Sequence, residues 1–257
     1  MSTATTAPSS ITMDTTLLLT SLALTLLLIA VSTYFLFFWS GKASGNAIYL
    51  VGPSGSGKTA LWTFVRHILN LVNKRSDMSS KLKYGRTVPT QTSMSINSCL
   101  LTHASLKKPV TIIDCPGHPR LAHLLRQSLA TTPPRGVTVL LDAATIKQDL
   151  NSVANSVYST LLALPRPIHV LFVANKSDLF TALPVHKVRE LLEEEISTLK
   201  KTRDDGLEDD EERPTLGGPE FNFSELEEDA VMVEWTKGSI ESREVAGVLE
   251  WVSDRIS

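Results

Sequence analysis

Apolar residues in this chain occur as short strand-like runs that alternate with longer stretches of helical spacing. Runs rich in β-branched and aromatic residues predict strands at about 46–51, 93–101, 109–113, 136–142, 168–174 and 230–235. Helical spacing predicts helices at about 58–73, 119–130, 147–163, 184–201 and 242–256. This alternation predicts one α/β domain, residues 46–257, with a central, mostly parallel sheet and helices on both faces.

The N-terminal part of the chain has a different pattern. From Leu17 to Trp39 there is no charged residue, and this run exceeds the roughly 20 residues that an α-helix needs to cross a bilayer core. Its aromatic end, Tyr34 to Trp39, suits a membrane interface. A cleaved signal peptide is the alternative, but the run is too long and no basic segment precedes it. The pattern therefore predicts a transmembrane helix at 17–39 after a short N-terminus, 1–16.

The orientation of that helix follows from the charges beside it. Residues 1–16 contain no Lys or Arg, whereas Lys42 and Lys58 follow the run. Because cytosolic flanks are enriched in basic residues, we expect residues 1–16 to be lumenal and the α/β domain to be cytosolic.

A glycine-rich segment, "GPSGSGKT", joins the first predicted strand to the first predicted helix. Its spacing, G-x-x-x-x-G-K-[ST], is that of a P-loop, in which backbone N–H groups and a lysine bind phosphates and a hydroxyl binds Mg²⁺. The predicted fold is therefore that of a P-loop NTPase. The candidate nucleotide-binding residues of this loop are Gly52, Pro53, Ser54, Gly55, Ser56, Gly57, Lys58 and Thr59, of which Thr59 is also a candidate metal ligand.

The sequence "VLFVANKSDLF" places Asn175, Lys176 and Asp178 at the end of a predicted strand, where ligands bind in open α/β sheets. This N-K-x-D pattern resembles the guanine-recognition motif of the Ras-like GTPases. The resemblance implies that the Asp178 carboxylate accepts hydrogen bonds from guanine and that the Lys176 stem packs over the base. The predicted cofactors are GTP and Mg²⁺.

Two further segments resemble the parts of a small G domain that sense the γ-phosphate. In "IIDCPGH", Asp114 is expected to hold Mg²⁺ through water, and the Gly117 N–H is expected to contact the γ-phosphate. In "GRTVPTQTS", Thr90 is the best match to the threonine that binds Mg²⁺ in the GTP state, and Thr92 is the alternative.

Two positions depart from the Ras-like pattern. His118 replaces the usual glutamine; it is either a residue that orients the attacking water or an exposed switch residue in a protein that hydrolyses GTP very slowly. "VEWTKGS" stands where these GTPases carry an S-A-K loop, with Thr236 and Lys237 as candidate nucleotide contacts. Such contacts would come mainly from the backbone.

Charge is distributed unevenly along the chain. Residues 204–229 hold twelve acidic residues and one basic residue, Arg213, while the rest of the chain holds 24 basic and 15 acidic residues, a net charge of +9. The acidic run predicts a solvated, partly disordered insertion. The basic remainder suits anionic lipid or an acidic partner. The two cysteines, Cys99 and Cys115, fit a reducing compartment.

An N-terminal hydrophobic span followed by "GPSGSGKT", "PTQTSM", "DCPGH" and "NKSD" resembles the family of signal recognition particle receptor β subunits over nearly the whole chain. The resemblance implies a single-pass protein of the endoplasmic reticulum membrane. It also implies a GTP-dependent complex with the receptor α subunit, whose N-terminal domain docks on the switch regions, and an indirect link to the signal recognition particle and the ribosome. No direct sequence-specific binding of nucleic acid is expected.

Two alternatives stay open. The first is an Arf- or Sar-like trafficking GTPase at an endomembrane; against it stand the uncharged span and Ser2, because N-myristoylation requires glycine at that position. The second is a GTP-loaded structural anchor that never cycles. Single-turnover hydrolysis distinguishes an active enzyme from such an anchor.

Overall fold

The structure is a computed structural model that describes residues 17–20, 22–29, 31–32, 45–73, 93–101, 109–204, 216–218 and 220–256. It divides into two units, 1–43 and 44–257.

In the first unit, residues 17–20, 22–29 and 31–32 are helical, and their large apolar side chains are exposed. Among the residues described, no helix is both long and apolar enough to cross a membrane. The predicted span, 17–39, and the predicted N-terminus, 1–16, lie partly or wholly outside the described residues, so both stay predictions.

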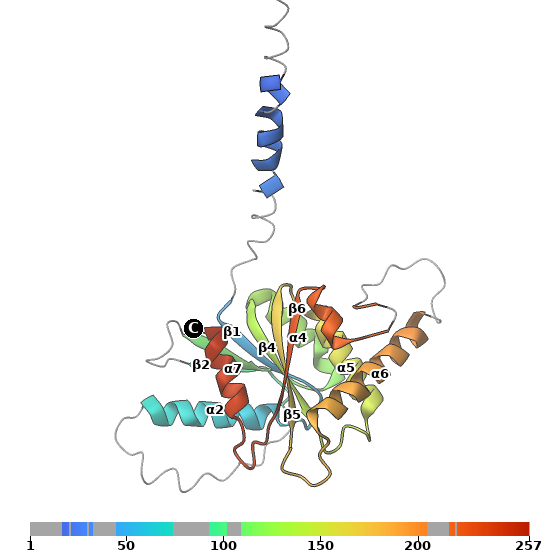
Figure 1. Cartoon of the computed structure of the whole chain (residues 1–257). Helices are drawn as coiled ribbons and strands as arrows, with labels where there is room; N and C mark the ends of the chain where they lie inside the picture. The colour runs from blue at the N-terminus through green and yellow to red at the C-terminus, as the bar shows by residue number, and fades with distance from the viewer. Residues whose placement is uncertain are drawn as a thin grey trace, which may run out of the picture. The chain divides into compact units, whose positions relative to one another are not determined.

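The second unit is built on a six-stranded sheet (Figure 1). The strands are β1 (Ala47–Val51), β2 (Asn97–Leu101), β3 (Val110–Asp114), β4 (Pro134–Asp142), β5 (Ile168–Asn175) and β6 (Val231–Lys237). Their order is β2-β3-β1-β4-β5-β6, and all neighbours are parallel except β2, which is antiparallel to β3. The prediction of a mostly parallel sheet is confirmed.

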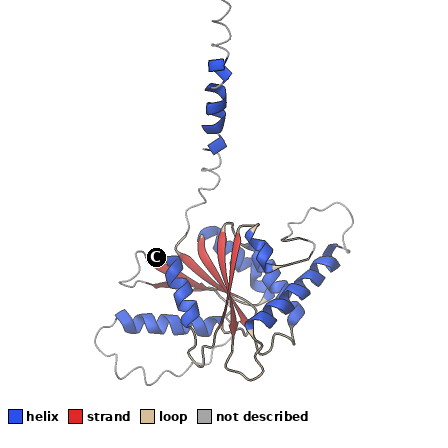
Figure 2. Cartoon of the chain, viewed as in Figure 1, coloured by secondary structure: helices blue, strands red, loops and turns tan. Residues whose placement is uncertain are grey.

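Helices follow β1, β3, β4, β5 and β6 in the chain (Figure 2). They are α2 (Lys58–Asn73), α4 (Ala122–Thr131), α5 (Leu150–Ala163), α6 (Val185–Asp204) and α7 (Ala246–Ile256), with 3-10 turns η2 (Pro119–Leu121) and η3 (Phe223–Glu227). The helix predicted from residue 119 begins as the separate turn η2, because Leu121, with a φ of −101° and a ψ of 7°, departs from helical geometry before α4 begins. Each predicted helix otherwise overlaps an observed one.

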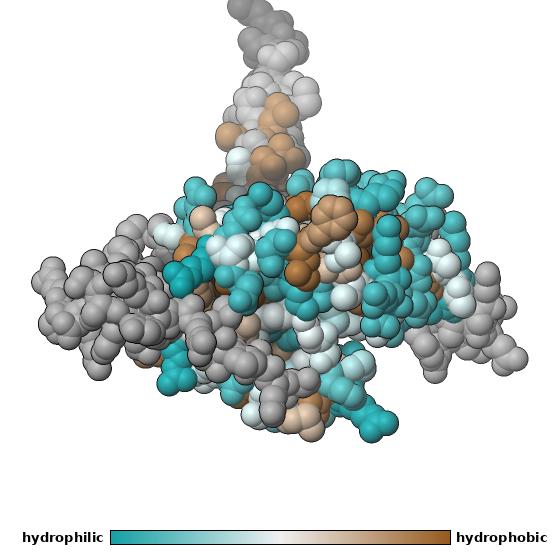
Figure 3. Space-filling view, turned by 90° about the horizontal axis from the view of Figure 1, so that it is seen from below, coloured by the Kyte–Doolittle hydropathy of each residue, from teal (hydrophilic) through white to brown (hydrophobic). Residues whose placement is uncertain are grey.

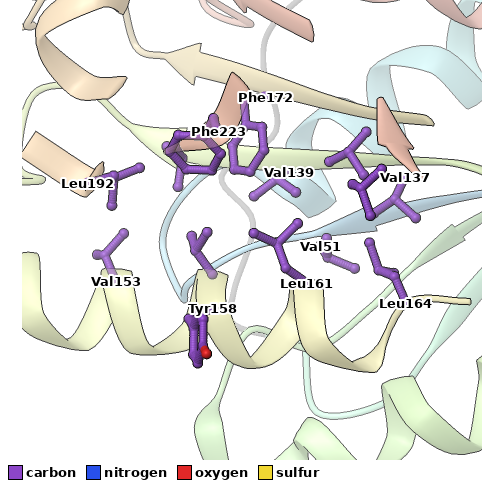
Figure 4. Close-up of a cluster of buried hydrophobic side chains, with 14 of the residues drawn as sticks. Val51, Val137, Val139, Val153, Tyr158, Leu161, Leu164, Phe172, Leu192 and Phe223 are labelled. Atoms are coloured by element: carbon purple, nitrogen blue, oxygen red, sulfur yellow. The ribbon is translucent and has the colours of Figure 1, made fainter. Parts of the chain in front are cut away.

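The sheet has an apolar core on each face because successive strand side chains point to opposite sides. In β1, Tyr49 and Val51 belong to one buried cluster, and Ile48 and Leu50 belong to the other. The first cluster includes residues of α5 and α6, and Figure 4 shows α5 side chains such as Leu161 facing the sheet. The second cluster includes residues of α2 and α7. Helices therefore cover both faces, as predicted.

The acidic insertion is not solvated along its whole length. Leu216, Phe221, Phe223 and Leu226 are buried, and the Phe223 ring packs edge-on against Phe172 at a centroid distance of 5.0 Å. The prediction of a solvated segment is wrong for Phe221, Phe223 and Leu226, whose apolar side chains turn inward, whereas the acidic residues between them, such as Glu225, are exposed. Residues 205–215 lie outside the described residues.

The parallel arrangement brings several loops to one edge of the domain. The loops that follow β5 and β6 lie at the lower edge of the sheet in Figure 1. Figure 3 views the molecule from this side, and the coloured surface there is mainly hydrophilic with separate hydrophobic areas. The carboxyl ends of parallel strands are where open α/β sheets bind ligands.

Candidate nucleotide-binding site

The glycine-rich loop turns tightly between β1 and α2. Gly52 has a φ of 137°, and a Cβ there would lie 2.2 Å from the Leu140 carbonyl oxygen, so only glycine fits. The Leu61 N–H donates to the Gly57 carbonyl at 2.9 Å where α2 begins. The first turn of α2 holds no acidic residue, so its own side chains leave the positive helix end available to an anion.

Lys58 is buried at the start of α2, with 6% of its surface exposed. Its Nζ donates to the Pro53 carbonyl at 2.7 Å and to Ser56 Oγ at 3.4 Å. Burial lowers the Lys58 pKa to about 8, although the negative charge of Asp114 opposes that shift. A bound anion would stabilise the charged ammonium in this position.

Oxygen atoms suited to a magnesium ion meet beside this lysine. Thr59 Oγ1 donates to Asp114 Oδ2 at 2.9 Å and lies 2.8 Å from Ser93 Oγ. Ser93 Oγ and Asn97 Nδ2 each donate to the same Asp114 oxygen at 3.3 Å. Asp114 is fully buried, and its other oxygen, Oδ1, has no hydrogen-bond partner among the described residues. Mg²⁺ prefers hydroxyl, carboxylate and water oxygens, so these residues fit it.

The segment after β3 approaches the glycine-rich loop closely. A Cβ on Gly117 would lie 2.5 Å from Lys58 Nζ and 2.6 Å from the Gly52 carbonyl oxygen, so a larger residue cannot stand there without a shift. His118 is exposed, and its Nδ1 accepts the Arg120 N–H at 3.2 Å. Neutral His118 therefore carries its proton on Nε2 in this arrangement, which lets it donate to a water.

Each residue of the N-K-x-D motif reaches a different element. Asn175 is buried, and its Nδ2 donates to the Ser56 carbonyl at 2.7 Å, which ties the motif to the glycine-rich loop. Lys176 Nζ donates to Asp142 Oδ2 at 2.5 Å. Asp178 Oδ1 accepts a hydrogen bond from the Ser239 hydroxyl. The structure thus joins the two motifs across 119 residues of sequence.

The loop after β6 differs from the arrangement that the sequence suggested. Thr236 and Lys237 belong to β6 itself; the Thr236 hydroxyl donates to the Lys237 carbonyl, and Lys237 Nζ lies 2.8 Å from Glu244. It is Ser239, fully buried, that contacts Asp178. Sequence reasoning missed Ser239, although it lies two residues beyond Lys237 in the same segment.

The structure therefore brings together the glycine-rich loop, Asp114, Gly117 and the N-K-x-D residues. Ser93, Asn97 and Asp142 join this site and were not predicted. Ser93 lies in the quoted segment "GRTVPTQTS" beside the two candidate threonines, whereas no short motif marks Asn97 or Asp142. The predicted switch threonines, Thr90 and Thr92, lie outside the described residues.

Comparisons with known proteins agree on one family. A family model described as "Signal recognition particle receptor beta subunit" matches residues 43–231. The signal recognition particle receptor subunit beta of Mus musculus is 31% identical over 223 residues, which cover 83% of this chain and 76% of that protein. The Saccharomyces cerevisiae protein of the same name is 28% identical, and the matched region covers 84% of this chain and 86% of that protein.

Solved structures of the same kind share the fold. A chain from "The Structure of the Mammalian SRP Receptor" has a TM-score of 0.62 at 28% identity, covering 81% of this chain and 99% of its own. A chain from the SRb-GTP/SRX complex of Chaetomium thermophilum has a TM-score of 0.63 at 27% identity, and the match covers 82% of this chain and 100% of that chain. A chain from an SRb-GDP-Mg structure from the same organism has a TM-score of 0.58 at 28% identity, covering 82% and 99%.

Proposed function

Because this chain belongs to the signal recognition particle receptor beta subunit family, we propose that it binds GTP and thereby holds the receptor α subunit at the endoplasmic reticulum membrane. Co-translational delivery of ribosomes to that membrane is the process that it serves.

The observation that carries this proposal is the joining of the phosphate loop to the base-recognition loop. The Asn175 amide donates to the Ser56 carbonyl at 2.7 Å, so a nucleotide bound at Lys58 presents its base beside Asp178. The Ser239 hydroxyl fixes one oxygen of the Asp178 carboxylate. A carboxylate accepts from the paired N–H donors of guanine, whereas adenine offers no such pair and would leave it unsatisfied. GTP is therefore the preferred nucleotide.

Mg²⁺ accompanies the nucleotide in this proposal. Thr59 supplies a hydroxyl, Asp114 acts through water from its unpartnered Oδ1, and Thr90 joins from the first switch. The ion would neutralise charge on the β- and γ-phosphates. A solved relative is described as SRb-GDP-Mg, and another as a GTP complex, which supports the pairing of nucleotide and metal.

The membrane attachment rests on the sequence from Leu17 to Trp39, which contains no charge. We propose that residues 17–39 span the membrane once, with residues 1–16 lumenal and the G domain cytosolic. Protease added to intact microsomes should digest the G domain and leave a small protected fragment. Full protection of the G domain would contradict this topology.

The partner is the receptor α subunit, and the docking face is the pair of switch segments around Thr90 and Gly117. A solved relative is described as an SRb-GTP/SRX complex, which supports a GTP-dependent partner. The full chain in detergent, loaded with a non-hydrolysable GTP analogue, should capture the α subunit from membrane extract far better than the GDP-loaded chain. Equal capture in both states would contradict a switch, and recovery of coat or tether proteins in its place would favour an Arf- or Sar-like trafficking GTPase.

Hydrolysis is a separate matter from binding. His118 stands next to Gly117 with Nε2 as its donor nitrogen, so it is the side chain that would orient an attacking water. Single-turnover hydrolysis by the parent chain and by His118→Ala measures that role. Equal rates in the two would assign His118 to the switch surface and not to catalysis.

A further inference from the structure

We infer that Asp142 is a positioning residue for the nucleotide base, because its carboxylate holds the Lys176 side chain in place beside the site. This inference rests on the proposed function, since it assigns Asp142 a part in the same guanine site. Asp142 belongs to none of the sequence motifs that identify the site.

The two residues meet because neighbouring parallel strands end together. Asp142 is the last residue of β4 and pairs in register with Asn175, the last residue of β5. Lys176 is the next residue along the chain, and its Nζ lies 2.5 Å from Asp142 Oδ2. The Ala143 N–H donates to the Asn175 carbonyl at 3.0 Å, which continues the strand pairing into both loops.

The carboxylate is itself held in a fixed orientation. Its other oxygen, Oδ1, accepts the backbone N–H groups of Ala144 at 3.0 Å and Thr145 at 3.3 Å. Only 13% of the Asp142 side chain is exposed. Burial alone would raise the Asp142 pKa, but the hydrogen bonds from Lys176, Thr145 and Ala144 outweigh it and lower that pKa. Asp142 is therefore a charged, oriented acceptor near neutral pH.

The backbone around Lys176 is also unusual. Lys176 has a φ of 62°, in the left-handed region that non-glycine residues seldom adopt. The Leu179 N–H donates to its carbonyl at 3.1 Å, and the Ser177 N–H donates to the Gly238 carbonyl at 3.1 Å. These bonds fix where the Lys176 side chain starts, and Asp142 fixes where it ends. The methylene stem between the two points loses its freedom before any nucleotide binds.

This arrangement divides the recognition of the base between two carboxylates. Asp178 acts on the edge of the base, where guanine differs from other purines. Asp142 acts through the Lys176 stem, whose packing against the face of a ring does not depend on the ring substituents. Loss of the Asp142 charge should therefore weaken the binding of related purine nucleotides alike, without changing the preference among them.

A purely structural role for Asp142 makes a different prediction. If the carboxylate only caps the turn at Ala144 and Thr145, its substitution would act equally whether or not Lys176 has an ammonium group. Asp142→Asn retains an oxygen for that turn while it removes the charge that faces Lys176. Lys176→Met retains an apolar stem and removes the ammonium, so the two variants and their combination separate the roles.

The test measures release of bound GDP and IDP from the full chain in detergent. IDP shares the purine ring of GDP but lacks the 2-amino group. Because partly exposed ion pairs contribute modestly, Asp142→Asn should speed the release of both nucleotides by roughly two- to fivefold and leave their ratio unchanged. In the Lys176→Met background, Asp142→Asn should have no further effect. Asp149→Asn, an exposed carboxylate in the same loop with no capping hydrogen bond, is the matched control and should match the parent.

Two results would overturn the inference: unchanged release from Asp142→Asn, or an equal acceleration with and without the Lys176 ammonium. Either result leaves guanine-nucleotide binding by the parent intact and so leaves the proposed function standing. Failure of the parent chain to bind GDP at all would overturn the proposed function itself.

Discussion

The Thr59 hydroxyl lies 2.9 Å from Asp114 Oδ2, so the first turn of α2 and the end of β3 meet at one point. Ser93 Oγ lies 2.8 Å from the same hydroxyl and 3.3 Å from the same carboxylate oxygen. Hydroxyl and carboxylate oxygens are the groups that Mg²⁺ prefers. This cluster therefore fits the proposed ion, with Thr59 as a direct ligand and Asp114 acting through water.

The first prediction follows from this spacing. Ser93→Ala removes a hydroxyl that orders both Thr59 and Asp114. The Mg²⁺ concentration that gives half-maximal slowing of GDP release should therefore rise roughly two- to tenfold, the effect of one hydrogen bond. Nucleotide release measured over a Mg²⁺ titration checks it. Ser95→Ala, at an exposed position nearby, is the control. A Ser93→Ala curve that overlays the parent would show that this hydroxyl has no part in holding the metal.

The second prediction concerns Ser239, which is fully buried and donates to Asp178. Ser239→Ala leaves the carboxylate that we propose binds guanine without that support, and hydrogen bonds to charged groups contribute more than neutral ones. GTP affinity should therefore fall by about tenfold or more. Equilibrium titration measures it, with Ser242→Ala as the control because the Ser242 backbone N–H, not its side chain, contacts Ser239. Equal affinities in parent and Ser239→Ala would remove Ser239 from the site.

The third prediction is a pH dependence set by Lys58, whose pKa is lowered to about 8 by burial in the nucleotide-free protein. Above that pH the side chain is neutral and must take up a proton to bind phosphate, so GTP affinity should fall with rising pH, approaching about tenfold per pH unit. The unfolded chain keeps this proton up to a pH near the ordinary value of 10.5. The free energy of unfolding of the nucleotide-free protein should therefore increase as the pH rises from about 8 towards 10.5.

The control for this pH dependence is Lys58→Arg, whose guanidinium stays charged throughout. In titrations from about pH 7 to about pH 9, GTP affinity should depend less steeply on pH for Lys58→Arg than for the parent. Some dependence should remain in both, because ionisation of the guanine ring is common to both. Parallel slopes would mean that Lys58 does not lose its proton in this interval.

The fourth prediction concerns the segment that carries Phe223. Its ring packs against Phe172 and, at a centroid distance of 5.1 Å, against Trp235 of β6. Phe223→Ala should lower the free energy of unfolding by about 3–5 kcal/mol. Phe180→Ala, at a fully exposed phenylalanine, should change it by no more than about 0.5 kcal/mol. Urea unfolding of the full chain measures both, and similar losses in the two variants would contradict a packed role for Phe223.

Local patterns predicted the parts of this protein that depend on local physics. The alternating side chains of β1 and the glycine spacing after it act within a few residues, so both could be identified from sequence. Asn175, Lys176 and Asp178 could be identified from their N-K-x-D pattern, which stands at the end of a predicted strand, where open α/β sheets bind ligands. The sequence also predicted the boundaries of β4 and β5 to within two residues.

The contacts that were missed join residues far apart in the chain. Ser239 and Asp178 are 61 positions apart, and Asp142 and Lys176 are 34 apart, so no spacing rule links either pair. Thr236 and Lys237 align with the S-A-K loop of the Ras-like GTPases. In the structure β6 extends through Lys237, so the loop begins only at Gly238 and Ser239. The prediction that the acidic insertion is solvated rested on its net charge and did not consider the alternate spacing of Phe221 and Phe223.

The central claim is that Asp178 reads guanine at a site whose phosphates are bound by Lys58. The most direct measurement is an equilibrium titration of the full chain in detergent with GTP, xanthosine triphosphate and ATP, using the parent, Asp178→Asn and Lys58→Ala. Asp178→Asn should lose about 1.5–3 kcal/mol of GTP binding, the scale for hydrogen bonds to a charged group. It should also bind xanthosine triphosphate better than the parent does, because the new amide matches the xanthine carbonyl. Lys58→Ala should weaken all three nucleotides, and an Asp178→Asn variant that keeps the parent's preference for GTP would contradict the account.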